Sequence, residues 1–328
     1  MRIGIISDVH AQPQLVRKGI ARLRDLGAER LIVNGDIGTH MELLEDSQRY
    51  TAEILGAIGE SGLESYVQPG SHESIAAYGS MIDIVSGRYR NIIDMLRTPS
   101  VDLAGYRLLF LPGSDSLSGG EYTFGAEVPT GRYALTETEL VPVKDWNTLS
   151  RLQAEERFQG EIHYTNLRDF VPFVENPEKT ILVCHVPARF DVGAQGVDFA
   201  YFATDREGSI IPGQHLEAQI IHAVREREGK LASAEEIARI AQVHGFTLRK
   251  ENVGNVLLRK FLEDMQIPYA VNGHIHESGH HAHDREGNAV PQKKSLPELF
   301  WNSGCFDRKQ MGILTLADEG VAYQNVLF

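Results

Sequence analysis

Short apolar runs recur along the chain, and most of them end in small or charged polar residues. Residues 2–6, RIGII, form such a run before SDVH, and residues 30–36, RLIVNGD, form another. Apolar runs of this length that stop at polar residues are typical of buried strands. Between them, residues 12–27 repeat apolar side chains at helical spacing and end at Gly27. The succession of strand, helix and strand predicts a βαβ unit with parallel pairing.

The same pattern returns later in the chain. A helical stretch at 41–59 precedes apolar runs at 64–74, 105–113, 180–186 and 269–274, and the tail carries three strand-like segments, ELFWNSG, QMGILTLA and GVAYQNVLF. Residues 114–170 show no clean periodicity, and residues 189–265 begin as a loop and become helical. We therefore expect a single α/β domain, 1–328, with two insertions at about 114–170 and 189–265.

Composition narrows the class of protein. The formal net charge is −13, which disfavours a general nucleic-acid binder because such proteins carry a basic face. Two cysteines, Cys184 and Cys305, make a disulfide framework improbable and favour the reducing cytoplasm. We expect neither a signal peptide nor a membrane span, because the apolar runs fall short of the roughly 20 residues that cross a bilayer.

Polar residues with metal-binding side chains follow five of the predicted strands. In parallel α/β sheets, ligands bind beyond the carboxyl ends of the strands. Two of the five ends carry candidate ligands two positions apart, and positions i and i+2 of an extended backbone face the same side. We expect one cavity to be surrounded by Asp8, His10, Asp36, Ser71, His72, His185, His274 and His276.

The side-chain types indicate which ions such a cavity would hold. Imidazole and carboxylate ligands suit Zn, Fe, Mn or Ni. Two aspartates and four histidines exceed the needs of one tetrahedral ion. They suffice for two divalent metals about 3.5–4 Å apart that share a carboxylate, as in two-metal hydrolytic sites.

In this order, the blocks DVH, GD, GSHE, a lone H and GHIH resemble those of the calcineurin-like metallophosphoesterases. The resemblance covers residues 1–112, 178–187 and 268–328, and it implies a four-layer αββα sandwich of two mixed sheets. It implies that Asp8, His10, Asp36 and His276 bind one metal and that Asp36, His185 and His274 bind the other, with Asp36 bridging. It also implies that His72 contacts the phosphate or protonates the leaving oxygen.

Ser71 departs from the family pattern, which has an asparagine that ligates the second metal at this position. A serine hydroxyl is a shorter and weaker neutral donor, so the second site is expected to bind its metal less firmly. His40 is a candidate to contact the metal ligands without binding a metal itself. His280, His281 and His283 are expected to lie in a solvated loop and not to bind metal.

These observations predict a hydrolase that cleaves a phosphomonoester or phosphodiester through a hydroxide bridging two metals, with a small phosphorylated molecule or nucleotide as substrate. The alternatives are a nuclease of the same chemistry and a non-catalytic scaffold that keeps the fold. The insertions are expected to form a cap over the site, because loops beside active sites often govern access. The sequence leaves the substrate, the metal identity and the oligomeric state open.

Overall fold

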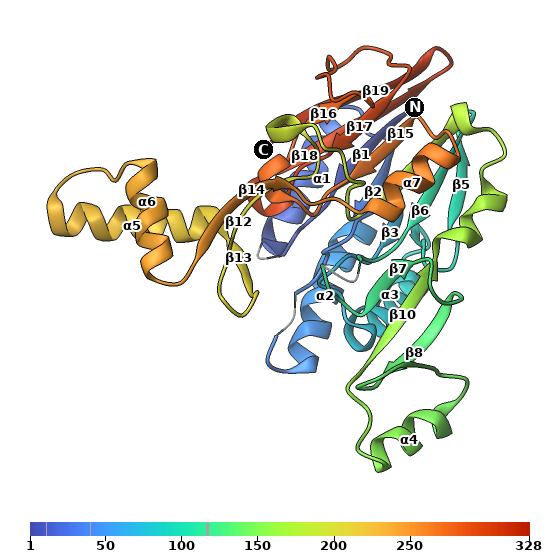
Figure 1. Cartoon of the computed structure of the whole chain (residues 1–328). Helices are drawn as coiled ribbons and strands as arrows, with labels where there is room; N and C mark the ends of the chain where they lie inside the picture. Colours follow the sequence, from blue (N-terminus) through green and yellow to red (C-terminus); the bar gives the residue numbers. More distant parts are fainter. Residues whose placement is uncertain (11, 40, 116–117) are drawn as a thin grey trace.

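The computed structural model describes residues 1–10, 12–39, 41–115 and 118–328, so His40 lies outside the described residues. Two six-stranded sheets form the body of the molecule, and two smaller sheets extend from it with helices of their own (Figure 1). None of the helices in the described part of the chain combines the length and the apolar character needed to cross a bilayer.

The first sheet contains the N-terminal βαβ unit and the C-terminal hairpin. Its strands lie in the order β19 (Gly320–Leu327), β18 (Gln310–Ala317), β1 (Arg2–Ile6), β2 (Arg30–Asn34), β3 (Glu64–Gln68) and β4 (Ile92–Asp94). β1 to β4 pair in parallel, whereas β18 pairs antiparallel with both β1 and β19. The parallel pairing predicted for residues 2–36 is confirmed, and the sheet is mixed.

The second sheet is also mixed and has four parallel strands at its centre. Its order is β16 (Ala282–His283), β17 (Leu299–Asn302), β15 (Tyr269–Asn272), β11 (Thr180–Cys184), β6 (Tyr106–Leu111) and β5 (Ser100–Leu103). β16 and β5 pair antiparallel at the two edges.

The two sheets pack face to face, and helices cover their outer faces. Alternate residues of each strand enter different cores: Ile32 joins the core between the sheets, whereas Leu31 and Val33 pack outward. The outer face of the first sheet carries α1 (Val16–Asp25), α2 (Leu44–Glu60) and α3 (Ser80–Arg88), which follows a π-helical turn at Ile75–Gly79. The outer face of the second sheet carries α7 (Val256–Asp264) and a 3-10 segment at Leu167–Phe173. This is the expected four-layer arrangement.

Both insertions contain sheet structure. The first holds α4 (Trp146–Ala154) and a sheet of β7 (Tyr122–Gly125), β10 (Gly160–Asn166), β8 (Gly131–Leu135) and β9 (Leu140–Pro142). The second holds β13 (Ile210–Pro212), β12 (Phe199–Thr204) and β14 (Thr247–Asn252), with α5 (Gly213–Glu228) and α6 (Ala234–Val243) projecting from the body (Figure 1). α7 falls inside the range 189–265 but packs on the second sheet, so the separate unit ends at β14.

Candidate metal centre

The carboxyl ends of five strands, three from the first sheet and two from the second, meet at one edge of the molecule. Asp8 follows β1, Asp36 follows β2 and His274 follows β15, and each has a positive φ, of 57°, 49° and 66°. Non-glycine residues rarely adopt this conformation, and it clusters at functional sites. Backbone hydrogen bonds hold the turns, because Asp8 N donates to Gly35 O at 3.1 Å and Val9 N donates to Asp36 O at 2.8 Å.

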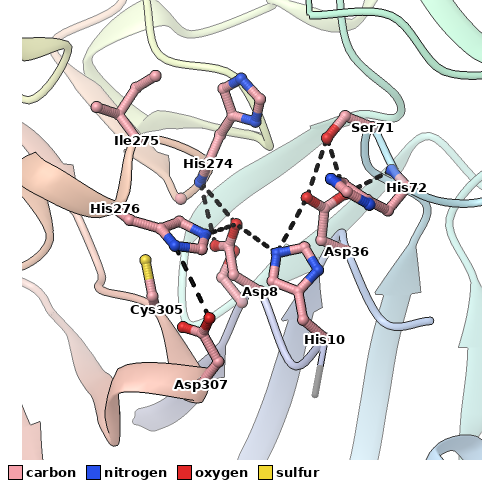
Figure 2. A network of polar contacts seen from close by, with 12 residues as sticks. Asp8, His10, Asp36, Ser71, His72, His274, Ile275, His276, Cys305 and Asp307 are labelled. Carbon is pink, nitrogen blue, oxygen red and sulfur yellow. Dashed lines mark hydrogen bonds and ion pairs between the residues drawn. The ribbon is translucent and has the colours of Figure 1, made fainter. Parts of the chain in front are cut away.

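One group of potential ligands contains Asp8, His10 and His276, whose ligand atoms all lie within 4.8 Å of one another. His276 Nε2 lies 3.4 Å and His10 Nε2 lies 3.8 Å from Asp8 Oδ1. The backbone N–H of His274 donates to both carboxylate oxygens of Asp8, at 3.1 and 3.2 Å (Figure 2). Asp8 is therefore held rigidly by its neighbours across the two sheets.

A second group contains Asp36, His185 and His274, whose ligand atoms also lie within 4.8 Å of one another. His185 Nε2 lies 3.1 Å from Asp36 Oδ2, and His10 Nε2 lies 3.5 Å from the same oxygen. Asp36 thus lies between the two groups, at the position that a bridging carboxylate would need. The assignment of each residue to a particular metal stays a prediction.

The donor set fits bound cations. The side chains of Asp8 and Asp36 are 0% and 2% exposed, and within the described chain their charged or titratable contacts are imidazoles rather than Lys or Arg. Buried carboxylates are costly unless positive charge compensates them. His185 Nδ1 donates to Asn34 O at 2.9 Å, which leaves Nε2, buried beside Asp36 Oδ2, directed at the centre. This is the usual orientation of a metal-binding imidazole.

The two carboxylates and the surrounding imidazoles shift one another's pKa values. Burial lowers the pKa of His185, but the Asp36 carboxylate outweighs burial and raises this pKa to about 10. Burial also favours the neutral form of the aspartates, yet the imidazoles hold the pKa of Asp8 and of Asp36 below the ordinary range. Burial lowers the pKa of His274 to about 4, and the charge on His185 acts in the same direction. Both aspartates are therefore negatively charged, and they favour positive charge beside them.

A family model of the calcineurin-like phosphoesterases matches residues 1–278, which include both groups of potential metal ligands. The chain belongs to this family. A structure from Thermus thermophilus covers 99% of this chain and 98% of its own, with 12% identity and a TM-score of 0.44. A dimetal phosphatase from Danio rerio covers 100% and 99%, with 10% identity and a TM-score of 0.45. A search among curated proteins finds no match.

Ser71 and His72, the third block of this calcineurin-like phosphoesterase, reach the same centre from the end of β3. Ser71 Oγ donates to the carboxylate of Asp36, at 3.0 and 3.1 Å, so its hydroxyl lies in the centre. The backbone N–H of His72 donates to Asp36 Oδ1 at 2.9 Å, and the His72 ring lies 4.7 Å from that of His10, centroid to centroid. His72 is exposed at the rim, where an incoming molecule can contact it.

Two glycines allow the strand ends to approach this closely. A Cβ on Gly70 would lie 2.5 Å from Asp36 Oδ1, and a Cβ on Gly273 would lie 2.5 Å from Asp8 Oδ2. Any side chain at these positions would displace a carboxylate from the centre.

Glu73, which follows His72, was not assigned a role from the sequence. Its buried carboxylate accepts the backbone N–H groups of Asp36, Ile37, Gly38 and Gly70. Burial and the nearby Asp36 charge raise the pKa of Glu73 to about 7, while these N–H groups oppose the rise. The position of Glu73 inside the quoted GSHE block is the only sequence signal for this role.

A second residue without an assigned role is Asp307, on the segment after β17. Asp307 Oδ2 lies 3.8 Å from His276 Nδ1, on the side of the ring opposite Asp8 (Figure 2). His276 and Asp307 form a further potential ligand group with Cys305, which is buried. Nothing in the local sequence relates Asp307 to His276. The two residues come together because β15 and β17, which precede them, pair in the second sheet.

The prediction for His280, His281 and His283 is partly wrong. Of the described residues, the groups able to hold a metal contain none of the three. However, they do not lie in a solvated loop. His283 is fully buried and accepts the N–H of Val197, while the other two contact the carbonyl oxygens of Met311 and Gly196. They are structural histidines: His280 contacts β18 of the first sheet, and His281 and His283 contact the start of the second insertion.

Proposed function

We propose that this metal-dependent phosphoesterase hydrolyses a phosphomonoester or phosphodiester of a small molecule. The observation that carries the proposal is the pair of adjacent ligand groups, Asp8–His10–His276 and Asp36–His185–His274, each with ligand atoms within 4.8 Å. Two divalent cations bound there would supply positive charge to the phosphoryl oxygens and an activated water molecule as nucleophile.

The protein's own residues would do the remaining work. The Asp36 carboxylate would hold both cations at a fixed spacing, and the hydroxyl of Ser71 and the N–H of His72 orient that carboxylate. His72 is an exposed imidazole with a ring nitrogen within 4.8 Å of an Asp36 carboxylate oxygen, so it is suited to donate a proton to the leaving oxygen or to contact the phosphate.

The charges around the centre favour a small substrate over nucleic acid. The described lining of a cavity of about 400 Å³ beside Ser71 and His72 includes the acidic residues Glu73, Glu121 and Glu161 and no Lys or Arg. Glu161 is paired with Arg132, so that arginine is already engaged. A polyanionic strand would need a basic groove at this position.

The test measures metal content and turnover in protein purified without chelator. Wild type with Mn is expected to bind two metals per chain and to hydrolyse p-nitrophenyl phosphate or its bis ester. Asp36→Asn is expected to lose turnover by at least about 10³-fold, because it removes the negative charge that the two cations would share. Asp264→Asn, at an exposed position on α7, is the matched control and should retain activity.

Each contrary outcome has a defined meaning. An Asp36→Asn variant with near-wild-type rate and full metal content would refute the two-metal assignment. A wild-type protein that binds no metal and turns over neither ester would favour the scaffold alternative. Preferential cleavage of single- or double-stranded DNA or RNA would favour a nuclease.

A further inference from the structure

A second cavity adjoins the metal centre on the side of His274. It has a volume of about 440 Å³ and is lined by Ser118, Val186, Ala200, Phe202, Ile210, Val253, His274 and Ile275. No Lys, Arg, Asp or Glu is among these residues, and six of the eight are apolar. Figure 2 shows Ile275 and the ring of His274 on the same side of the centre, away from Asp307.

The second insertion supplies the apolar wall of this cavity. Ala200 and Phe202 are two residues apart on β12, so both side chains face the same side of the strand. Ile210 comes from β13, which pairs with β12, and its side chain is 66% exposed. The fold leaves this isoleucine uncovered beside the metal centre, so its apolar surface is available to contact a ligand.

The base of this wall is fixed to the metal centre. Asp198, just before β12, accepts N–H groups from Phe190 and Gly254 and from the side chain of Asn252. Ser278 Oγ, two residues after His276, donates to Val197 O at 2.6 Å. The apolar wall therefore holds a defined position relative to the ligand groups.

We infer that this cavity binds the organic part of the substrate, and that the substrate is a phosphoester carrying an apolar or aromatic group. The inference rests on the proposed function, because it places the phosphate at the metal centre. A charged organic group, such as a further phosphate or a carboxylate, would lose part of its hydration against Phe202 and Ile210, and the described lining offers it no Lys or Arg. An aromatic group would instead bury apolar surface there.

The larger cavity of about 640 Å³ beside Tyr106, Lys179 and Tyr269 is not a competing substrate site. These residues lie at the amino ends of β6, β11 and β15, opposite the edge that carries the metal ligands.

The test is calorimetric binding of two phosphonates, which share a headgroup and are not hydrolysed, to the Mn-loaded protein. We expect 1-naphthylmethylphosphonate to bind about tenfold or more tightly than methylphosphonate, because only the former fills the apolar cavity. Ile210→Ser should reduce this ratio by about threefold. Val243→Ser is the matched control, since Val243 is a similarly exposed apolar residue on α6 outside the cavity, at 74% exposure.

A second variant tests the cavity by its charge. Ile210→Lys should weaken binding of the naphthyl compound and strengthen binding of phosphonoacetate, whose carboxylate then gains a partner. Equal affinity of wild type for methyl- and naphthylmethylphosphonate would overturn the inference and leave the proposed function intact. Absence of binding by both phosphonates, together with absence of phosphoester turnover, would instead overturn the proposed function.

Discussion

Replacing Glu73 with glutamine should destabilise the centre without removing a metal ligand. The carboxylate of Glu73 accepts four backbone N–H groups, two on each oxygen. Oε2 accepts from Asp36 and Gly70 at 3.2 and 2.5 Å, and Oε1 accepts from Ile37 and Gly38 at 2.5 and 2.9 Å. In Glu73→Gln, an amide NH₂ replaces one oxygen and faces two donors, so two buried N–H groups lose their acceptor.

The expected cost follows from these two groups. A buried donor left without a partner costs about 1–3 kcal/mol, so the free energy of unfolding should fall by about 3 kcal/mol after partial relaxation. The loop at residues 36–38 also carries Asp36, so Mn affinity should fall as well. Urea denaturation and calorimetric Mn titration measure the two effects. Glu53→Gln, at an exposed position on α2, should change the free energy of unfolding by less than about 0.5 kcal/mol.

The reasoning fails if Glu73→Gln unfolds with a free energy within about 1 kcal/mol of wild type and binds Mn with unchanged affinity. That result would mean that the four N–H groups find other acceptors, and that Glu73 does not set the position of the Asp36 loop. Loss of Mn affinity with unchanged stability would separate an electrostatic role of Glu73 from its structural one.

Two further predictions concern residues at and beside the centre. Ser71→Asn supplies a longer side chain with an amide oxygen, so the second metal should bind about tenfold more tightly. Unchanged metal stoichiometry and affinity in Mn titrations would count against a ligand role at this position. Burial lowers the pKa of His283, whose neutral ring accepts the Val197 N–H, so its contribution to stability is present above the unfolded pKa near 6.5 and is lost as pH falls. Relative to His283→Gln, wild type should therefore lose up to about 1.4 kcal/mol of unfolding free energy per pH unit as the pH falls below 6.5, and parallel pH profiles would contradict this.

The strand ends were predictable from sequence because their signal is local. Asp8 and Asp36 each follow an apolar run, and strand direction alone places them at one edge of the sheet. Glu73 and Asp307 act through partners that are distant along the chain, so no spacing rule connects them to Asp36 or to His276. The same holds for His283, where a polar run suggests a loop but pairing of β16 with β17 buries the ring.

The insertions show a different limit of sequence patterns. Residues 114–170 build strands as short as β9, three residues long, and burial along the strands of this sheet follows no sustained period, because β7 is buried throughout whereas β9 has no buried residue. Periodicity detects an element only when one face stays buried over several turns or alternations. In the second insertion, the proposed binding of the substrate's organic group depends on a few side chains, such as Phe202 and Ile210. The strands β12 and β13 place these side chains beside the centre.

The backbone of the centre indicates why so few residue types suit it. Asp8, His10, Asp36 and His274 all have positive φ, a conformation that costs of order 1 kcal/mol each for a non-glycine residue. The cost is offset by hydrogen bonds that exist only in this conformation, such as His274 N to the Asp8 carboxylate. These turns aim both carboxylates at one point, and the burial that follows makes them strong ligands for divalent cations. Alanine at Asp36 would thus remove a ligand and keep the strain, whereas asparagine tolerates the same φ and isolates the loss of charge.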